Sequence, residues 1–393
     1  MSVWEHLVGQ EPVVAQLQAA AVAAREVVDG GEGRGMTHAW LFTGPPGSGR
    51  SLAARAFAAA LQCTGPEPGC GHCAACTQVL HGSHTDVAEE AIEGLSLGIK
   101  EVRRIVDHSY RRPSLGRWLV TLVEDADRMP EYASNALLKA IEEPPPRGVL
   151  LLCAPSAEDL LPTIRSRCRS VPLRTPSAAA VADVLVRRDG VDPAMAAFAA
   201  RASQGHVGRA RRLATDEASR RERQDVLALV RSLQTIGSAL AAAQGLVDAA
   251  KEEAERVAGS RDSAEKEELA TALGAGATGK GLTGGTPRGG AGALKELEQK
   301  QKSRSTRTVR DNLDRALVDL TAFYRDVLTV QLGTGSDLVH ADLGEQAAAI
   351  ARATTPESTV HRLDAITGCR EALDANVAPL LAVEAMALAL RTG

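Results

Sequence analysis

The stretch "HAWLFTGPPGSGRSLAARAFAAALQ", residues 38–62, holds a predicted strand, a glycine-rich loop and a predicted helix in direct succession. The apolar run "HAWLFTG" predicts the strand, and the alanine-rich "RSLAARAFAAALQ" predicts the helix. A loop in this position turns its backbone N–H groups and the positive end of the helix dipole toward a phosphate group. This succession therefore predicts an α/β fold of the P-loop class.

The loop itself, "GPPGSGRS" (44–51), matches the phosphate-loop pattern G-x-x-x-x-G-K-[ST] at every defined position except one. Gly44, Gly47 and Gly49 allow the backbone to curl around phosphate oxygens, and the Ser51 hydroxyl is expected to reach Mg²⁺. Arg50 stands where the pattern has lysine, and a planar guanidinium is not equivalent to a compact ammonium. The loop alone leaves two interpretations open: a nucleotide site, and a phosphate loop retained as a rigid turn.

Three domains are expected along the 393 residues. Residues 1–175 alternate helical and strand patterns, such as the strands "RWLVTLVED" and "GVLLLCAP", and predict an α/β domain with a mostly parallel sheet. Residues 176–215 predict a small helical domain. Residues 216–393 predict an all-α domain, in which the glycine-rich residues 274–293 form a flexible insertion between two charged helices.

Charge and composition exclude several classes of function. The net charge of -4 argues against a chain that binds nucleic acid through its overall charge, and the aromatic fraction of 3% supplies few rings for base stacking. The N-terminus has no basic region followed by an apolar one, and the chain has no run of eighteen apolar residues. These features predict a cytoplasmic protein that does not enter a membrane.

A cluster of cysteines follows the predicted phosphate-loop helix. Cys63, Cys70, Cys73 and Cys76 have the spacing C-x6-C-x2-C-x2-C, which lets four thiolates surround one tetrahedral metal ion. Because protein ligands would fill all four positions, we expect a structural Zn²⁺ site and not a catalytic one. The alternative is a chance cluster of reduced thiols.

Together these features resemble the clamp-loader branch of the AAA+ ATPases, and within it the delta-prime subunits of bacterial DNA polymerase III. The resemblance covers residues 3–215 and rests on six motifs in order. These are "LVGQ" (7–10), "GPPGSGRS", the four-cysteine module (63–76), "SNALLKAIEEPP" (134–145), "TIRSRC" (163–168) and "GHVGRA" (205–210). The resemblance implies an AAA+ domain, a small helical lid and a helical collar that holds an oligomer together.

The resemblance also implies a degenerate nucleotide site. Glu124 stands where the gamma and tau motor subunits place the aspartate that binds Mg²⁺, and Asp125 stands where they place the catalytic glutamate. The chain reads Cys153-Ala154-Pro155 where the motors carry a sensing hydroxyl, and Gly208 where they carry a sensing arginine. These departures imply that binding of ATP and Mg²⁺ is uncertain and that the chain's own ATPase activity is weak or absent.

Arg167, in "TIRSRC", corresponds to the arginine finger of the family, which reaches the nucleotide bound to a neighbouring subunit. The implied role is a stator that helps to load the sliding clamp on primed DNA. The implied partners are gamma/tau and delta subunits in a hetero-pentamer, the sliding clamp, and primed DNA through the assembly.

Two other functions remain open at this point. The first is an active motor ATPase of the gamma/tau type. The second, from another class, is a P-loop kinase or nucleotide-dependent transferase, for which the sequence shows no acceptor-site motif and which leaves the helical C-terminal domain unexplained.

Overall fold

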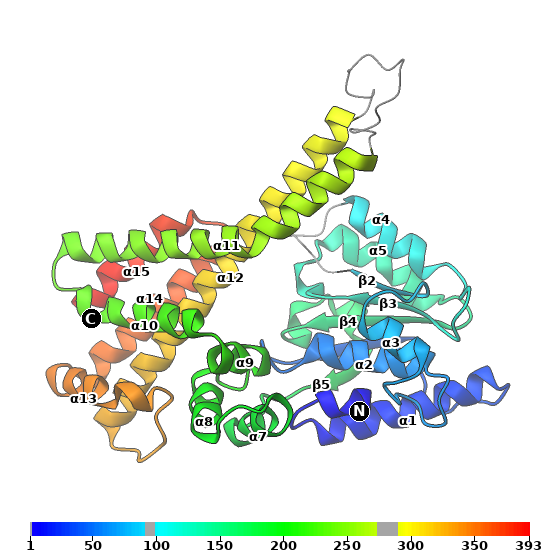
Figure 1. Cartoon of the computed structure of the whole chain (residues 1–393), viewed down its shortest axis with the longest axis horizontal. Helices are drawn as coiled ribbons and strands as arrows, with labels where there is room; N and C mark the ends of the chain where they lie inside the picture. The colour runs from blue at the N-terminus through cyan, green and yellow to red at the C-terminus, as the bar shows by residue number, and fades with distance from the viewer. Residues whose placement is uncertain (1, 91–98, 273–289) are drawn as a thin grey trace. The chain divides into compact units, whose positions relative to one another are not determined.

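The computed structural model describes residues 2–90, 99–272 and 290–393. The chain divides into two compact units, a first unit that ends at Thr215 and a second unit that runs from Asp216 to Gly393 (Figure 1). No helix in these described ranges is both long and apolar enough to cross a membrane.

The centre of the first unit is a five-stranded sheet with the strand order β2-β3-β4-β1-β5, in which all paired neighbours run parallel. The strands are β1 (Ala39–Thr43), β2 (Val87–Glu90), β3 (Leu119–Val123), β4 (Gly148–Ala154) and β5 (Arg169–Pro172). β1, β3 and β4 are buried along their whole length, as expected for parallel strands covered on both faces.

Helices cover both faces of this sheet (Figure 1). Because successive side chains of a strand point to opposite faces, Trp40 and Phe42 pack on one face while Leu41 packs on the other. The face of Trp40 is covered by η1 (Val3–His6), α1 (Glu11–Val28), α2 (Arg50–Gln62) and α3 (Ala74–Leu80). The face of Leu41 is covered by α4 (Ile99–Ser109), α5 (Glu131–Glu142) and α6 (Pro162–Arg165). Two further single turns, η2 (Ala126–Arg128) and η3 (Ala157–Asp159), follow β3 and β4.

The first unit ends in a group of three helices, α7 (Ala178–Asp189), α8 (Pro193–Ala202) and α9 (Val207–Thr215). Ser177 and Asp192 cap the N-termini of α7 and α8, and Gly190 ends α7 in the left-handed conformation. Their apolar side chains form a cluster of their own, separate from the two clusters on the sheet. These helices lie within residues 176–215, for which the sequence predicts a small helical domain, and they belong to the same compact unit as the sheet.

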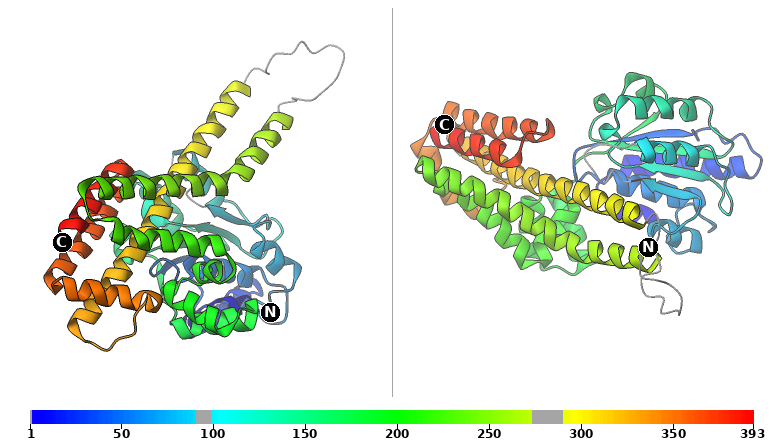
Figure 2. Two further views of the ribbon diagram at one scale, coloured as in Figure 1. Left: turned by 60° about the vertical axis from the view of Figure 1, so that its left-hand side comes forward. Right: turned by 90° about the horizontal axis from the view of Figure 1, so that it is seen from above.

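The described residues of the second unit form helices and the loops that join them. Its elements are α10 (Glu217–Ser232), α11 (Ile236–Ala272), α12 (Gly290–Leu332), η4 (Ala341–Leu343), α13 (Gly344–Ala353), α14 (Pro356–Asp374) and α15 (Pro379–Thr392). α12 supplies Leu313, Leu317, Leu320 and Phe323 to one apolar core at the spacing of a helix face. α11 and α12 run side by side, and their distal halves extend beyond this core (Figures 1 and 2).

The predicted fold class, a P-loop α/β domain with a parallel sheet followed by helical regions, is confirmed. Two strands were not predicted, β2 ("VAEE") and β5 ("RSVP"), because they are short, polar edge strands without an apolar run. The predicted insertion 274–293 lies largely outside the described residues. Its last four residues, 290–293, belong to α12, so the prediction of an irregular segment was wrong there.

Candidate nucleotide site and candidate metal centre

The phosphate loop connects β1 to α2 at the carboxyl edge of the sheet. Gly44, Gly47 and Gly49 have φ values of 151°, 84° and 92°, and Gly49 is the left-handed N-cap of α2. L-residues with a side chain rarely adopt such values, so the three glycines are needed for this backbone path. The backbone therefore has the form that cradles a phosphate group.

Arg50 bends back over the loop that it follows. Its Nη1 donates a hydrogen bond of 2.9 Å to the carbonyl oxygen of Gly44. Arg50 also lies close enough to Asp127 to oppose the effect of burial, which raises the pKa of that carboxyl. The guanidinium is thus engaged with the protein's own groups, whereas the lysine of the standard pattern extends toward the phosphates.

The helical group α7–α9 contacts the loop through His206. A Cβ atom at Gly47 would lie 2.6 Å from the Cβ of His206, so the imidazole-bearing residue packs directly against the loop backbone. His206 Nδ1 accepts a hydrogen bond of 3.2 Å from the backbone N–H of Arg209, near the start of α9. Gly208, where the family comparison expects an arginine, is exposed.

Carboxylates gather where β2 and β3 end. Arg55, on α2, donates through Nε to Glu89 at 3.1 Å, and its Nη2 lies 3.7 Å from Glu124. Burial raises the pKa of the Glu124 carboxyl and the charge of Glu89 raises it further, while a hydrogen bond from the Ser51 hydroxyl and the charge of Arg55 act in the opposite direction. Asp125 has a φ of 51° and is the N-cap residue of η2. The sequence analysis did not identify Arg55 and Glu89 as residues of the site. Arg55 could have been identified, because a charged residue on an alanine-rich, buried helix indicates a charged partner nearby.

At the end of β4, the side chain near the carboxyl edge of the sheet is the thiol of Cys153 and not a hydroxyl group. Cys153 is buried, and burial together with the charge of Glu124 raises the pKa of its thiol. Pro155 accepts a hydrogen bond of 3.0 Å from the backbone N–H of Gly44. Ser156 caps η3 and is hydrogen-bonded to Glu158, so its hydroxyl serves the turn in which it stands. At the end of β4 the described groups nearest the phosphate loop are thus a buried thiol and a backbone carbonyl.

Arg167 follows α6 on the surface of the first unit, far along the chain from the phosphate loop. Its Nη1 donates to the carbonyl oxygen of Thr163 at 3.0 Å, and its Nη2 lies 2.8 Å from a carboxylate oxygen of Glu142. The side chain is 42% exposed, so this pair is open to water and to a partner. The structure thus places Arg167 where another molecule can reach it.

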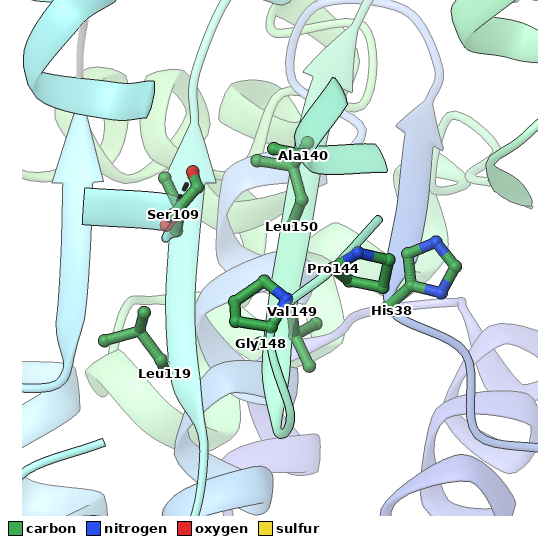
Figure 3. A pocket seen from close by; sticks show the side chains of 10 residues that line it. His38, Ser109, Leu119, Ala140, Pro144, Gly148, Val149 and Leu150 are labelled. Atoms are coloured by element: carbon green, nitrogen blue, oxygen red, sulfur yellow. Dashed lines mark hydrogen bonds between the residues drawn. The ribbon is translucent and has the colours of Figure 1, made fainter. Parts of the chain in front are cut away.

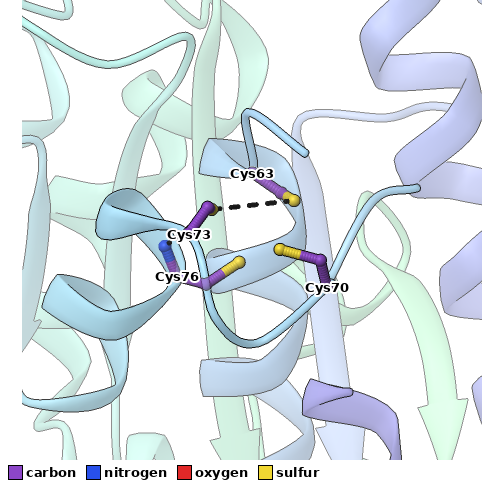
Figure 4. A group of neighbouring side chains, drawn as sticks. All are labelled: Cys63, Cys70, Cys73 and Cys76. Carbon is purple, nitrogen blue, oxygen red and sulfur yellow. Dashed lines mark hydrogen bonds between the residues drawn. The ribbon is translucent and has the colours of Figure 1, made fainter. Parts of the chain in front are cut away.

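The four predicted cysteine ligands converge (Figure 4). The Sγ atoms of Cys63, Cys70, Cys73 and Cys76 all lie within 4.8 Å of one another, and those of Cys63 and Cys73 are 3.9 Å apart. Four sulfurs at about 2.3 Å from one tetrahedral zinc ion are separated by about 3.8 Å, close to the 3.9 Å between Cys63 and Cys73.

The electrostatics of the cluster also fit a dication. Burial raises the pKa of the Cys76 thiol, and its neighbours Cys73 and Cys63 raise it further. Burial also acts to raise the pKa of the Cys73 thiol, but hydrogen bonds from the backbone of Cys76 and Thr64 outweigh burial and lower this pKa to about 5. Four thiolates this close repel one another unless a cation compensates them. The cluster can therefore hold a metal ion, with protein ligands at all four positions.

A small cavity lies at the opposite edge of the sheet, near the residues that begin β3 and β4 (Figure 3). It is lined by His38, Ser109, Leu119 and Pro144 among others, and His38 Nε2 is 2.6 Å from the carbonyl oxygen of Ile141. It holds no more than about one water molecule. We therefore assign it no ligand.

The parallel sheet, the phosphate loop after β1 and the helical group α7–α9 define the first unit as a P-loop domain of the AAA+ type. A sequence model of the family described as "DNA polymerase III, delta subunit" matches residues 25–177. The delta-prime subunit of DNA polymerase III from Pseudomonas aeruginosa is 39% identical over 163 residues, which are 40% of this chain and 50% of that protein. The gamma/tau subunit from Mycobacterium tuberculosis is 33% identical over 171 residues, 43% of this chain and 28% of that protein.

The α/β domain of this chain is thus similar in sequence to DNA polymerase III delta-prime and gamma/tau subunits. The chain spans half the length of the first of these relatives and 28% of the second. A solved structure described as a gamma subunit-related protein from Thermotoga maritima covers 95% of this chain and is itself covered to 99%, at 16% identity and a TM-score of 0.46. That likeness is too distant to carry a functional conclusion.

Proposed function

We propose that this chain is a delta-prime-like stator subunit of a bacterial DNA polymerase III clamp loader. In this proposal it is a cytoplasmic protein of three domains, an AAA+ domain (1–175), a lid (176–215) and a collar (216–393). It assembles with gamma/tau and delta subunits and helps them to load the sliding clamp on primed DNA. The observation that carries the proposal is the hydrogen bond from Arg50 to Gly44, which turns the cation of the phosphate loop inward.

The other groups at this edge support the absence of efficient hydrolysis. A motor needs an acidic residue to prepare the attacking water and a group that senses the γ-phosphate. Here Asp125 has a carboxylate one methylene shorter than glutamate, and Cys153 supplies a buried thiol in the region of the sensor. Misplacing a catalytic group by about 1 Å costs on the order of a hundredfold in rate. The combined departures favour a subunit that uses nucleotide poorly or not at all.

Arg167 supports a role in the reaction of a neighbour. In the proposal its guanidinium reaches the γ-phosphate of ATP bound to an adjacent motor subunit and stabilises the charge that develops there. An arginine supplied in this way contributes about 10³ to 10⁵ in rate in related systems. Reaching a neighbour requires Arg167 to exchange its exposed contact with Glu142 for the phosphate, and such exposed pairs are worth at most about 1 kcal/mol.

The metal in the four-cysteine cluster is zinc in this proposal, held by Cys63, Cys70, Cys73 and Cys76. Its chemistry there is structural, because the thiolates leave no position for water or substrate. Native protein should contain about one zinc per chain by elemental analysis, released by a thiol-modifying reagent. Protein purified without chelator that contains no zinc would contradict this part.

A gamma/tau-type motor remains the second candidate, and one observation favours it. Ser48 Oγ and Asp127 Oδ1 are buried without a hydrogen-bond partner in the described ranges, as expected where a ligand or water completes the site. Steady-state ATP hydrolysis and equilibrium binding of labelled ATP by the purified chain separate the two candidates. The stator predicts no turnover and weak or no binding, whereas turnover at the rate of a gamma/tau subunit would refute it.

The role of Arg50 in these assays is tested by Arg50→Lys, which restores the standard sequence pattern of the phosphate loop and removes the hydrogen bond from Arg50 to Gly44. We expect it to raise ATP affinity by at least about tenfold, about 1.4 kcal/mol, without restoring hydrolysis, because Glu124, Asp125 and Cys153 are unchanged. An unchanged or lower affinity would show that Arg50 does not keep nucleotide out.

The role of Arg167 is tested in the assembly with gamma/tau and delta subunits. Arg167→Ala should lower the ATPase rate of the assembly by more than about tenfold. Arg165→Ala is the matched control, since Arg165 lies two positions away, is also 42% exposed and pairs with Glu158 at 3.6 Å. Equal rates for the two variants, with both assembling normally, would rule out the finger.

A further inference from the structure

The N-terminal segment, residues 2–10, lies between the cysteine loop and the phosphate loop. It comprises Ser2, the single turn η1, and the residues that lead to α1. Its side chains Val3, Trp4 and Leu7 are buried in the same apolar cluster as Cys63 and Cys76. The segment is therefore part of the packed first unit and not a loose end.

One end of the segment is bound to the backbone of the cysteine loop. The N–H of Val3 donates to the carbonyl oxygen of Gly69 at 3.0 Å, and the Ser2 hydroxyl donates to the same oxygen at 3.2 Å. Trp4 Nε1 donates to the carbonyl oxygen of Pro68 at 3.1 Å. The approach is close, since a Cβ at Gly69 would lie 2.6 Å from Trp4 Nε1.

A second element contacts the same loop from α1. Arg25 Nη1 donates to the carbonyl oxygen of Pro66 at 2.6 Å, and its Nη2 donates to that of Cys63 at 3.4 Å. Carbonyl groups of residues 63–69 thus accept hydrogen bonds from the side chains of Ser2, Trp4 and Arg25 and from the backbone N–H of Val3. Acceptors in a loop hold such donors only while the loop keeps its curvature.

The other end of the segment is bound to the phosphate loop. The Nε2 of Gln10 donates to the carbonyl oxygen of Ser48 at 3.3 Å and to that of Arg174 at 2.6 Å, and its Oε1 accepts from the N–H of Arg174 at 3.2 Å. Gln10 is only 3% exposed. It joins the phosphate loop to the chain that leads into α7, so a shift of Gln10 displaces both.

We propose that the N-terminal segment is a strut that couples the cysteine loop to the phosphate loop. The inference rests on the proposed metal site, because Cys63 and Cys70, which flank residues 64–69, would both bind the metal. When those cysteines release their metal, the acceptors for Ser2, Val3 and Trp4 are lost. The segment then loosens, and Gln10 no longer fixes the backbone at Ser48.

Hydrogen exchange of the full chain, read by mass spectrometry, tests the strut. Removing the metal with a chelator and a mild thiol reagent should speed exchange in peptides covering 2–10 and also in peptides covering 44–51. Loss of one buried hydrogen bond corresponds to about a five- to tenfold increase in local opening. Exchange in the second unit should not change, which distinguishes the coupling from general unfolding.

Two variants separate the strut from a direct effect of the metal. In Gln10→Ala, metal removal should still speed exchange at 2–10 but should add nothing at 44–51, because the connection is already broken. Gln16→Ala is the matched control, since Gln16 Nε2 also donates to a backbone carbonyl, that of Ser170 at 3.3 Å, without touching the phosphate loop. It should behave as the original chain does.

Zinc content is measured on the same samples, so that failure of the metal site is distinguished from failure of the strut. If zinc is present and its removal leaves exchange at 44–51 unchanged, the strut is refuted. If the native protein holds no zinc, the proposed metal site fails and Trp4→Phe decides alone. Faster exchange at both 2–10 and 44–51 in that variant supports the strut, and unchanged exchange at 44–51 refutes it.

Discussion

Asp86 is expected to set the acid stability of the first unit. It is 2% exposed and stands just before β2, where it accepts hydrogen bonds from the chain that leads to β3. Its Oδ1 accepts from the N–H and the hydroxyl of Ser114, both at 2.7 Å, and its Oδ2 accepts from the N–H of Leu115 at 2.8 Å and from that of Gly116. Burial alone raises the pKa of this carboxyl, but the donors outweigh burial and lower it from 3.8 to about 2.

The size of the effect follows from that shift. Since one pKa unit is worth about 1.4 kcal/mol, the lower folded-state pKa stabilises the fold by about 2–3 kcal/mol. Because the folded-state pKa is the lower one, the stabilisation is fully present above pH 4 and is lost as the pH falls through about 2. Asp86→Asn keeps the shape, but it offers one acceptor oxygen and turns an NH₂ group toward N–H donors. We therefore expect it to cost about 2–3 kcal/mol at pH 7.

Tryptophan fluorescence during urea denaturation is a suitable assay, because Trp4, Trp40 and Trp118 all lie in the first unit. The stability difference between Asp86→Asn and the original chain should shrink between pH 4 and pH 2. Asp192→Asn is the control, since asparagine caps a helix about as well as aspartate and its midpoint should hardly move. Equal midpoints for Asp86→Asn and the original chain at pH 7, or a difference that is independent of pH, would refute the reasoning.

Two further predictions concern the second unit. Burial lowers the pKa of His340, and the charge of Arg223, whose Nη2 lies 2.6 Å from His340 Nδ1, lowers it further, while Asp319 and Asp326 act in the opposite direction. Arg223 in turn pairs with Asp342. Stability that is present above about pH 6.5 should therefore be lost as the pH falls through the lower folded-state pKa of His340. Urea denaturation followed by circular dichroism checks this, and a His340→Gln variant that keeps the same pH dependence would contradict it. Arg304→Met should loosen the distal halves of α11 and α12 by about 1–3 kcal/mol, because Arg304 Nη2 lies 2.5 Å from Asp262 and 2.7 Å from Glu265. Hydrogen exchange should become faster in those halves alone. Arg307→Met is the control, because it breaks the ion pair with Asp311 within α12 and should leave the distal halves protected.

The central strands could be predicted from the sequence because burial on both faces demands continuous apolar runs, as in β1 and β4. The cysteine cluster could be predicted because its members lie within one short stretch, so that their spacing alone limits the geometry. Edge strands such as β2 do not have these constraints. The position of β2 is fixed by its pairing with β3, which no local sequence pattern records.

The contacts that define the candidate nucleotide site were hidden for a different reason. Gln10 meets Arg174 across 164 positions, and His206 reaches Gly47 from a separate helical group. The sequence shows that Arg50 departs from the standard pattern, but not that its guanidinium turns toward Gly44. Likewise "TIRSRC" marks Arg167, whereas its pairing with Glu142 depends on how α5 and α6 pack. Side-chain direction at such sites depends on tertiary contacts that lie far apart in the chain.

The ionic pairing of α11 and α12 has a consequence for how the second unit can vary. Beyond Ala254 on α11 and before Val309 on α12, the paired helices are joined by Arg304 and its carboxylates, outside the apolar core. Deleting or adding matched whole turns there should change the reach of the pair and leave the core intact. The length of the paired helices is therefore a feature of this chain that natural variation, or an engineer attaching a probe, can adjust.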